Sequence, residues 1–319
     1  IDVWPVKSEE SHLQFRIDRF NGMMGAQIPR EFIVDIRTDQ AQERISANGV
    51  STWIERGVPG RHGEVRVREY TPDGEPSGPR LVWVHGGGWV VGTLDEPEAH
   101  AVSMAVAKAG FPVTSVEYGL LPMFPLVGPL RLRPSPFRYP VSQDQVMDAW
   151  LDAQRTHGGA MWLGGASAGA CLAAAVALRL RDGEGSRPAG LAFLYGLFHG
   201  VLPEPSASLR RRMFGVSDLR VVQEMVRRAA VNHAGHADDL HNHAIFPGLS
   251  DLTGLPPVHL LNADRDLLRA SAENFAHRLT QADVPHEGWY LHGTTHGFLA
   301  RPEKPPFGVG VRAIAGWLA

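Results

Sequence analysis

This sequence has almost no cysteine, a small net charge and few extended apolar stretches. Among its 319 residues there is one cysteine, Cys171, so no disulfide can form within the chain. This scarcity is typical of a reducing compartment, and we expect a cytoplasmic protein. The 31 Lys and Arg residues nearly balance the 34 Asp and Glu residues, which leaves a formal net charge of −3. Such a balance argues against a nucleic-acid partner, which normally requires a strongly basic face.

One uncharged stretch, residues 158–178, reaches the length of a membrane span. A glycine pair starts this stretch and a second pair interrupts it, so we interpret its halves as a short strand and a helix and predict no membrane span. No signal peptide can be laid out at the N-terminus. Because the chain begins at Ile1 rather than Met, a removed leader stays open as an alternative.

The overall composition is that of a globular protein. The chain is 44% hydrophobic and 20% charged, which excludes a disordered or collagen-like protein. We find no internal repeat and no low-complexity tract. The length fits one large α/β domain with an appended cap, and we predict a single domain over residues 1–319.

Strand patterns and helix patterns alternate along most of the chain. The expected strands are residues 64–70, 81–84, 112–118, 161–165, 189–194, 258–261 and 289–291, and the expected helices are residues 97–109, 141–156, 168–181, 270–281 and 309–318. This alternation predicts a mostly parallel sheet flanked by helices. Residues 1–57 lack strand signals, and we expect them to be helical.

Two segments do not fit the alternation: the proline-rich residues 122–140 and the charged, His-rich residues 202–243. Each follows the carboxyl end of an expected strand, where open α/β sheets place their ligand sites. We interpret them as a pocket wall and a lid. Surface elaboration without function is the alternative, and the proline-rich segment could also form a dimer contact.

The sequence Gly-Ala-Ser-Ala-Gly at 165–169 lies between an apolar strand pattern and an Ala-rich helix pattern. In that setting it predicts a nucleophile elbow, a strained turn that holds Ser167 above the sheet at the start of a helix. The helix dipole would favour negative charge developing there. The alternative is a serine that only caps the helix.

The sequence His-Gly-Gly-Gly-Trp at 85–89 directly follows a buried strand pattern. Successive glycines leave backbone N–H groups uncovered, and two of them can point at one oxygen. Such donors matter in acyl transfer, which places negative charge on the carbonyl oxygen. Losing one donor costs on the order of 3–4 kcal/mol of transition-state stabilisation.

Together these two motifs resemble the hormone-sensitive-lipase branch of the α/β-hydrolase esterases. The resemblance runs from about residue 64 to the C-terminus. It implies an α/β-hydrolase fold, with a mostly parallel central sheet flanked by helices and with a helical cap contributed by about 1–57 and about 202–243. It also implies that the N–H groups of Gly87, Gly88 and Ala168 form the oxyanion hole.

The sequence departs from the family pattern in two places. Ala166 stands where the family often has Asp or Glu before the serine. The family's Tyr-Arg-Leu-Ala-Pro stretch is interrupted after Tyr118, and the matching Arg-Leu-Arg-Pro begins only at Arg131. The second departure puts the pocket shape, and therefore the substrate, in question.

A serine nucleophile needs a base to take its proton and a carboxylate to hold that base, and in this fold the acid precedes the histidine in the chain. His296 begins a His-Gly-Phe sequence that matches the family's loop; His292 is the competitor, interpreted as the polar end of a strand. Asp264 and Asp266 both lie where a strand meets a helix, so spacing does not decide between them. The family pattern favours Asp266, which leaves Asp264 to cap the helix or to pair with an arginine.

The four histidines between residues 233 and 243 match no zinc spacing, so we predict no metal and interpret the segment as solvated. No dinucleotide or Walker fingerprint is present, and no nucleotide cofactor is predicted.

The sequence therefore predicts a carboxylesterase-type serine hydrolase for a small-molecule ester. His296 would deprotonate Ser167, Asp266 would steady the imidazolium, and water would release the acyl-enzyme. Two alternatives stay open: an acyltransferase or an amide- or lactone-cleaving enzyme with the same triad, and a non-catalytic small-molecule binding protein on this fold. A homodimer is also open.

Overall fold

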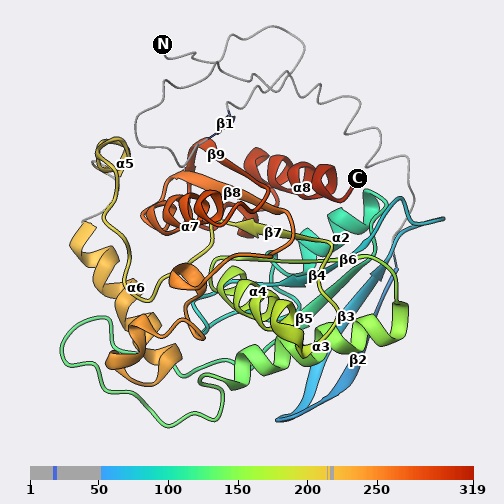
Figure 1. The fold of residues 1–319 in the computed structure, drawn as a ribbon, viewed down its shortest axis with the longest axis horizontal. Helices are drawn as coiled ribbons and strands as arrows, with labels where there is room; N and C mark the ends of the chain where they lie inside the picture. The colour runs from blue at the N-terminus through green and yellow to red at the C-terminus, as the bar shows by residue number, and fades with distance from the viewer. Residues whose placement is uncertain (1–16, 20–51, 214, 216–218) are drawn as a thin grey trace, which may run out of the picture.

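The structure is a computed structural model that describes residues 17–19, 52–213, 215 and 219–319. A single sheet runs through this part of the chain (Figure 1). Its strands are β1 (Ile17–Arg19), β2 (Thr52–Gly60), β3 (Gly63–Thr71), β4 (Arg80–Val84), β5 (Val113–Glu117), β6 (Met161–Ala166), β7 (Gly190–Leu194), β8 (Val258–Arg265) and β9 (His286–Thr295). Their order is β1-β9-β8-β7-β6-β4-β5-β3-β2. The strands β4 to β9 pair in parallel, whereas β1 at one edge and β2 and β3 at the other pair antiparallel.

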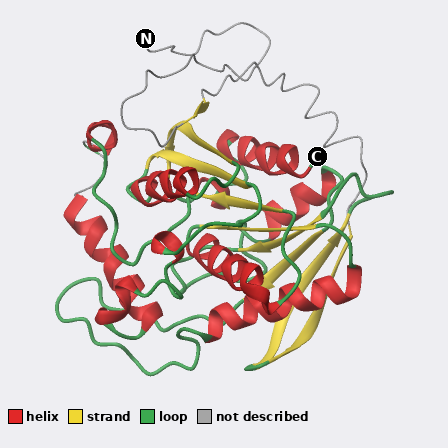
Figure 2. Ribbon diagram, in the orientation of Figure 1, coloured by secondary structure: helices red, strands yellow, loops and turns green. Residues whose placement is uncertain are grey.

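Helices cover both faces of this sheet (Figures 1 and 2). They are α2 (His100–Lys108), α3 (Val141–His157), α4 (Ala168–Arg179), α5 (Ala207–Met213), α6 (Leu219–Ala234), α7 (Arg269–Gln281) and α8 (Pro305–Leu318), with short helical turns at Leu180–Glu184, Ala237–His241, Pro247–Leu249 and Phe298–Ala300. The apolar faces of α3, α4 and α7 pack on one side of the sheet, and those of α2 and α8 pack on the other.

Strand β4 illustrates why the parallel strands read as continuous apolar runs. Val82 and Val84 belong to the core beneath α3 and α4, while Leu81 and Trp83 belong to the core beneath α2 and α8. Side chains alternate between the two faces of a strand, and here both faces are buried. The predicted mostly parallel sheet flanked by helices is confirmed, and each strand and helix expected between residues 64 and 318 is present with adjusted ends.

The expectation of helices over residues 1–57 is wrong where the structure describes that region, because residues 17–19 form β1 and residues 52–60 form β2. Strand β2 lies at the edge of the sheet and keeps most of its side chains exposed, including Trp53 at 43% and Ile54 at 61%. Because its side chains are exposed on both faces, β2 lacks the alternation of apolar and polar residues that marks a half-buried strand. The remainder of the expected N-terminal cap lies outside the described residues.

The two segments that break the alternation pack against each other. Arg228 of α6 donates hydrogen bonds to the carbonyl oxygens of Pro125 at 2.9 Å and Gly128 at 2.7 Å. Asn232, one turn further along α6, donates to the carbonyl oxygen of Pro122 at 3.0 Å. The proline-rich segment and α6 therefore form one unit, and their roles as pocket wall and lid stay predictions.

The prediction that the His-rich segment is solvated is wrong for His233. Its side chain is fully buried, and its ring stacks on Trp89 with centroids 4.4 Å apart. Burial lowers the pKa of His233 to about 3, so the ring is neutral. Three other histidines of the segment, His236, His241 and His243, are exposed.

Among the described residues, no three His, Cys, Asp or Glu side chains are grouped in a way that could hold a metal ion. None of the described helices combines the length and the apolar character needed to cross a bilayer.

Candidate active site

The parallel strands bring the expected site residues together at the carboxyl ends of the strands. The glycine loop follows β4, Ser167 follows β6, Asp266 follows β8 and His296 follows β9. Because these strands are parallel, their carboxyl ends lie together, which is where open α/β sheets hold their sites.

Ser167 occupies a strained turn between β6 and α4. Its backbone has φ 52° and ψ −118°, a conformation that L-residues rarely adopt. Its N–H donates to the carbonyl oxygen of Leu194 at 3.0 Å, and its side chain makes no capping hydrogen bond to α4. The alternative in which the serine merely caps the helix is therefore not observed.

Two glycines make this turn sterically feasible. A Cβ on Gly165 would lie 2.7 Å from the carbonyl oxygen of Val84, and a Cβ on Gly169 would lie only 2.2 Å from the same oxygen. No side chain fits at either position, so the packing of the elbow against β4 requires glycine.

The structure brings the predicted serine, histidine and aspartate into a continuous hydrogen-bonded row. Ser167 Oγ lies 2.9 Å from Nε2 of His296, and Nδ1 of the same ring lies 2.7 Å from Oδ2 of Asp266. With Nδ1 donating to the carboxylate, Nε2 is free to accept the proton of the serine hydroxyl.

The electrostatic surroundings of His296 raise its pKa. Burial alone would lower the pKa of His296, but the charge and hydrogen bond of Asp266 and the charge of Glu98 outweigh it, so the pKa is raised. The His296 side chain is 41% exposed, whereas Asp266 is 5% exposed. The imidazole of His296 can thus be reached from outside, while the carboxylate of Asp266 is enclosed.

Asp264 and His292, the two competitors, are used elsewhere. Asp264 Oδ1 lies 3.3 Å from Nη1 of Arg269, and its Oδ2 accepts a hydrogen bond from the N–H of Gly293 at 3.1 Å. His292 Nδ1 lies 3.5 Å from the same carboxylate. Asp264 therefore pairs with an arginine, as one expectation had it, and ties the carboxyl end of β8 to that of β9.

The glycine loop at residues 85–89 is held by contacts to the peptide group between Gly86 and Gly87. The carbonyl oxygen of Gly86 accepts hydrogen bonds from Nδ1 of His85 at 2.9 Å and from the hydroxyl of Tyr118 at 2.7 Å. The C=O and N–H of one trans peptide point in opposite directions. These buried donors therefore aim the N–H of Gly87 away from the core.

His85 and Tyr118 are themselves fixed. Their rings stack with centroids 4.5 Å apart, and both side chains are buried. Burial lowers the pKa of His85 more than its hydrogen bond to Gly86 raises it, so the ring is neutral and can donate through Nδ1. The backbone at Gly87 and Gly88 has φ 93° and 60°, which glycine adopts without strain.

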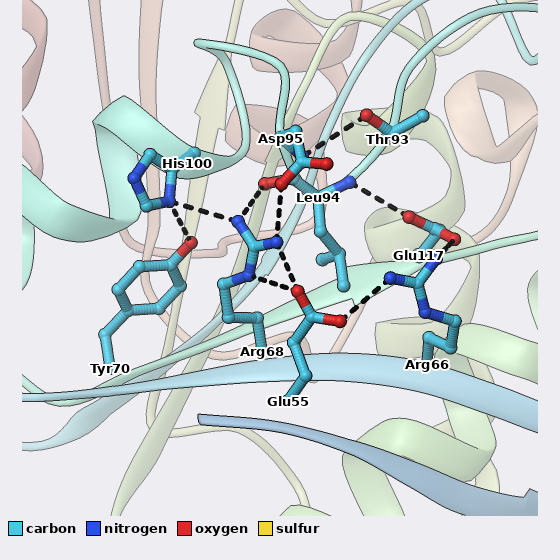
Figure 3. A network of polar contacts seen from close by, with 9 residues as sticks. All are labelled: Glu55, Arg66, Arg68, Tyr70, Thr93, Leu94, Asp95, His100 and Glu117. Atoms are coloured by element: carbon cyan, nitrogen blue, oxygen red, sulfur yellow. Dashed lines mark hydrogen bonds and ion pairs between the residues drawn. The ribbon is translucent and has the colours of Figure 1, made fainter. Parts of the chain in front are cut away.

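A second set of contacts fixes the chain downstream of the glycine loop (Figure 3). Arg68 on β3 is only 2% exposed and donates to the carbonyl oxygen of Leu94 at 2.8 Å. Its guanidinium also pairs with Asp95 at 2.6 Å and with Glu55 of β2. On the other side Glu117 accepts the N–H of Leu94 at 3.0 Å.

Sequence reasoning named the serine, histidine and aspartate that the structure brings together, and it missed three side chains behind them. Tyr118 entered only as a break in a family pattern, and Glu98 and Tyr195 were not singled out. No sequence spacing points to them, because their partners come from separate strands and loops.

A family model described as alpha/beta hydrolase fold matches residues 81–300 of the chain. Among curated proteins, the carboxylic ester hydrolase LipN of Mycobacterium tuberculosis is 28% identical over 249 residues, which cover 76% of this chain and 63% of LipN. The chain thus spans somewhat less than two thirds of that relative's length.

Solved structures give the same result for the fold. A hyperthermophilic esterase from the archaeon Pyrobaculum calidifontis matches with a TM-score of 0.70 and 24% identity over 88% of this chain and 90% of that one. An esterase of the bacterial hormone-sensitive lipase family matches with a TM-score of 0.68 and 20% identity over 91% and 92%. Together with the sequence relatives, these matches confirm the resemblance to hormone-sensitive-lipase-like carboxylesterases.

Proposed function

Because the chain belongs to the α/β-hydrolase fold family, we propose that it is a carboxylesterase-type serine hydrolase acting through an acyl-enzyme. Relatives described as ester hydrolases support ester cleavage. The observation that carries the finer mechanism is the row of hydrogen bonds from Ser167 through His296 to Asp266.

In the first step, His296 Nε2 takes the proton of Ser167 as the serine oxygen attacks the ester carbonyl carbon. Asp266 stabilises the imidazolium that forms and keeps the ring in the productive tautomer. The imidazolium then gives its proton to the leaving alcohol, and the acyl group stays on the serine oxygen. A water molecule, deprotonated by the same ring, attacks the acyl carbon. The bond from that carbon to the serine oxygen then breaks, the imidazolium returns its proton to the serine oxygen, and the acid is released.

We propose that the N–H groups of Gly87, Gly88 and Ala168 stabilise the oxyanion of both tetrahedral intermediates. The support is that the Gly86 carbonyl is held from the buried side, which turns the next N–H outward. Ala168 is the first residue of α4, where backbone N–H groups lack a partner within the helix. Fixed donors of this kind cost no reorganisation during reaction.

The experiment combines a fluorophosphonate probe with a series of p-nitrophenyl esters of increasing acyl length. The wild-type protein should be labelled at Ser167 and should turn over the shorter esters, whereas Ser167→Ala should do neither. Ser208→Ala, which changes an exposed serine on α5, is the matched control and should behave as wild type. Turnover that survives in Ser167→Ala would contradict the proposal.

The same assay separates the open alternatives. Added alcohols should leave the products unchanged if water is the acceptor, whereas ester products would indicate an acyltransferase. A folded wild-type protein that binds esters without turnover would instead indicate a binding protein.

A further inference from the structure

One carboxylate lies behind the candidate active site and has no place in the mechanism above. Glu98 precedes α2, and its backbone carbonyl accepts a hydrogen bond from the indole N–H of Trp83 on β4 at 2.8 Å. Its Oε2 accepts the backbone N–H of Gly86 at 2.6 Å, and its Oε1 accepts the hydroxyl hydrogen of Tyr195 at 2.5 Å. One carboxylate therefore joins the loop after β4 to the loop after β7.

The first of these contacts lies next to the nucleophile. A Cβ added to Gly86 would be 2.5 Å from Oε2 of Glu98 and 3.0 Å from the Cβ of Ser167. The carboxylate and the serine thus flank the same glycine. With its N–H bound to Glu98 and its C=O bound to Tyr118, Gly86 has both backbone groups fixed immediately before the proposed oxyanion donors.

The second contact reaches the base. The Tyr195 ring is fully buried and lies edge-on to the His296 ring, with centroids 5.0 Å apart. Its backbone has φ 38°, a positive value that L-residues rarely adopt. Burial raises the pKa of Tyr195 well above its usual value, so the hydroxyl remains a donor to the carboxylate at any ordinary pH.

We propose that Glu98 is a positioning residue for ester hydrolysis, whose carboxylate anchors the oxyanion loop through Gly86 and the wall of the general base through Tyr195. This inference rests on the proposed function, since it assigns Glu98 a role in that reaction. Loss of the anchor would let two parts of the transition-state site drift at once, and small misplacements of such groups reduce rates strongly.

The charge of Glu98 acts on the same base. It adds to the charge of Asp266 in raising the pKa of His296. Among the described residues, the charge of Glu98 also acts on His85, Tyr118 and Tyr195, of which the histidine is neutral and the two tyrosines are buried phenols. Removing the charge should therefore shift the protonation of His296 to lower pH.

Two substitutions separate anchoring from charge. In Glu98→Gln, the amide oxygen can still accept the N–H of Gly86, and the amide N–H₂ can donate to the Tyr195 oxygen once that hydroxyl rotates, so the hydrogen bonds persist and the charge is lost. Glu98→Ala removes both acceptors. Tyr195→Phe keeps the ring against His296 and removes the hydroxyl, which donates to Glu98 and also interacts with the backbone of Leu299. Glu96→Gln changes an exposed glutamate as the matched control.

The measurements are kcat and KM for a p-nitrophenyl ester, the pH profile of kcat/KM, the rate of fluorophosphonate labelling and the melting temperature. Glu98→Ala should lower kcat by about 10- to 100-fold with KM nearly unchanged, as expected for a group that supports transition-state donors. Glu98→Gln should lose less activity but move the acid limb of kcat/KM to lower pH. Tyr195→Phe should fall between Glu98→Ala and the control in kcat, and Glu96→Gln should match wild type.

A merely structural Glu98 would lower the melting temperature while leaving kcat, the pH profile and the labelling rate of the folded fraction unchanged, and that result would overturn the inference. If Glu98→Ala does not fold, the pH profile of Glu98→Gln and the kcat of Tyr195→Phe decide the question. If the wild-type protein turns over the ester and the Glu98 variants behave like Glu96→Gln, the role of Glu98 is refuted and the proposed function stands. A wild-type protein without turnover or labelling would refute the proposed function and this inference with it.

Discussion

Two aspartates two positions apart provide a direct test of the proposed triad. Asp266 and Asp264 are 5% and 1% exposed, so the consequences of burying an amide are nearly matched between them. They differ in their partners, because Asp266 contacts His296 at 2.7 Å whereas Asp264 contacts Arg269 at 3.3 Å. We therefore expect Asp266→Asn to lower mainly the activity and Asp264→Asn to lower mainly the stability.

In Asp266→Asn, the amide can donate a hydrogen bond to Nδ1 of His296. The ring proton then resides on Nε2, which can no longer accept the proton of Ser167. This wrong tautomer is expected to lower kcat by about 10⁴-fold. At 1.36 kcal/mol for each factor of ten, that fall corresponds to about 5.4 kcal/mol of lost transition-state stabilisation. The fold should change little, since the side chain keeps its shape.

In Asp264→Asn, the amide oxygen can still accept the N–H of Gly293, but the charge facing Arg269 is lost. The guanidinium keeps Glu273 at 2.7 Å but loses the buried charge of Asp264, and we expect about 1–3 kcal/mol of destabilisation. Since Asp264 does not contact His296, kcat should stay within about threefold of wild type, a change of less than 0.7 kcal/mol at about 1.4 kcal/mol per factor of ten.

The assay is kcat on a p-nitrophenyl ester together with urea unfolding of both variants. A kcat of Asp266→Asn within about tenfold of wild type would refute the reasoning, since it would leave less than about 1.4 kcal/mol for the orienting acid. Equal losses of activity in the two variants would refute it as well, because burial rather than contact with the base would then explain the effect.

Three further outcomes follow from the same contacts. Because the base must be neutral to accept a proton and the pKa of His296 is raised, kcat/KM should fall on an acid limb centred above the usual histidine value of about 6.5, measured as a pH profile. Gly169→Ala places a Cβ 2.2 Å from a carbonyl oxygen of β4, so the elbow must move and kcat should fall by about 100-fold, whereas Gly316→Ala, with open space around it, should match wild type in the same assay. Arg68→Met removes a buried guanidinium and leaves the carbonyl oxygen of Leu94 without its donor. The loss should lower the free energy of unfolding in urea by about 2–3 kcal/mol, whereas Arg155→Met, at an exposed position, should cause no measurable loss.

Much of the fold was predictable because most of the parallel strands are buried on both faces. In β4 and β7 this burial requires a run of apolar residues, which the sequence displays openly. Strand β2 could not be predicted in the same way. It lies at the edge of the sheet, its side chains are mostly exposed, and its pairing with β3 depends on backbone hydrogen bonds that any residue other than proline can supply.

The candidate site also has one part that the sequence predicts and another that it does not. Gly165 and Gly169 are dictated by close backbone contacts, so the elbow is visible in the sequence. The choice between Asp264 and Asp266 is not, because both carboxylates leave the end of β8 and only the three-dimensional course of the loop after β9 decides which one meets His296. The family resemblance supplied what spacing could not.

The glycine loop shows why a motif identifies a site without determining its activity. Three successive glycines allow many backbone conformations, so the motif by itself does not fix the direction of their N–H groups. The direction comes from a phenol 32 residues away in the chain that holds the Gly86 carbonyl, and from a carboxylate 12 residues away that holds the Gly86 N–H. A chain with the same five residues at 85–89 but without Tyr118 and Glu98 would have the motif and lack the fixed donors. The geometry of the loop is therefore a tertiary property of β4, β5 and the segment before α2, and the catalytic consequences of its anchors should be separable from those of the glycines themselves.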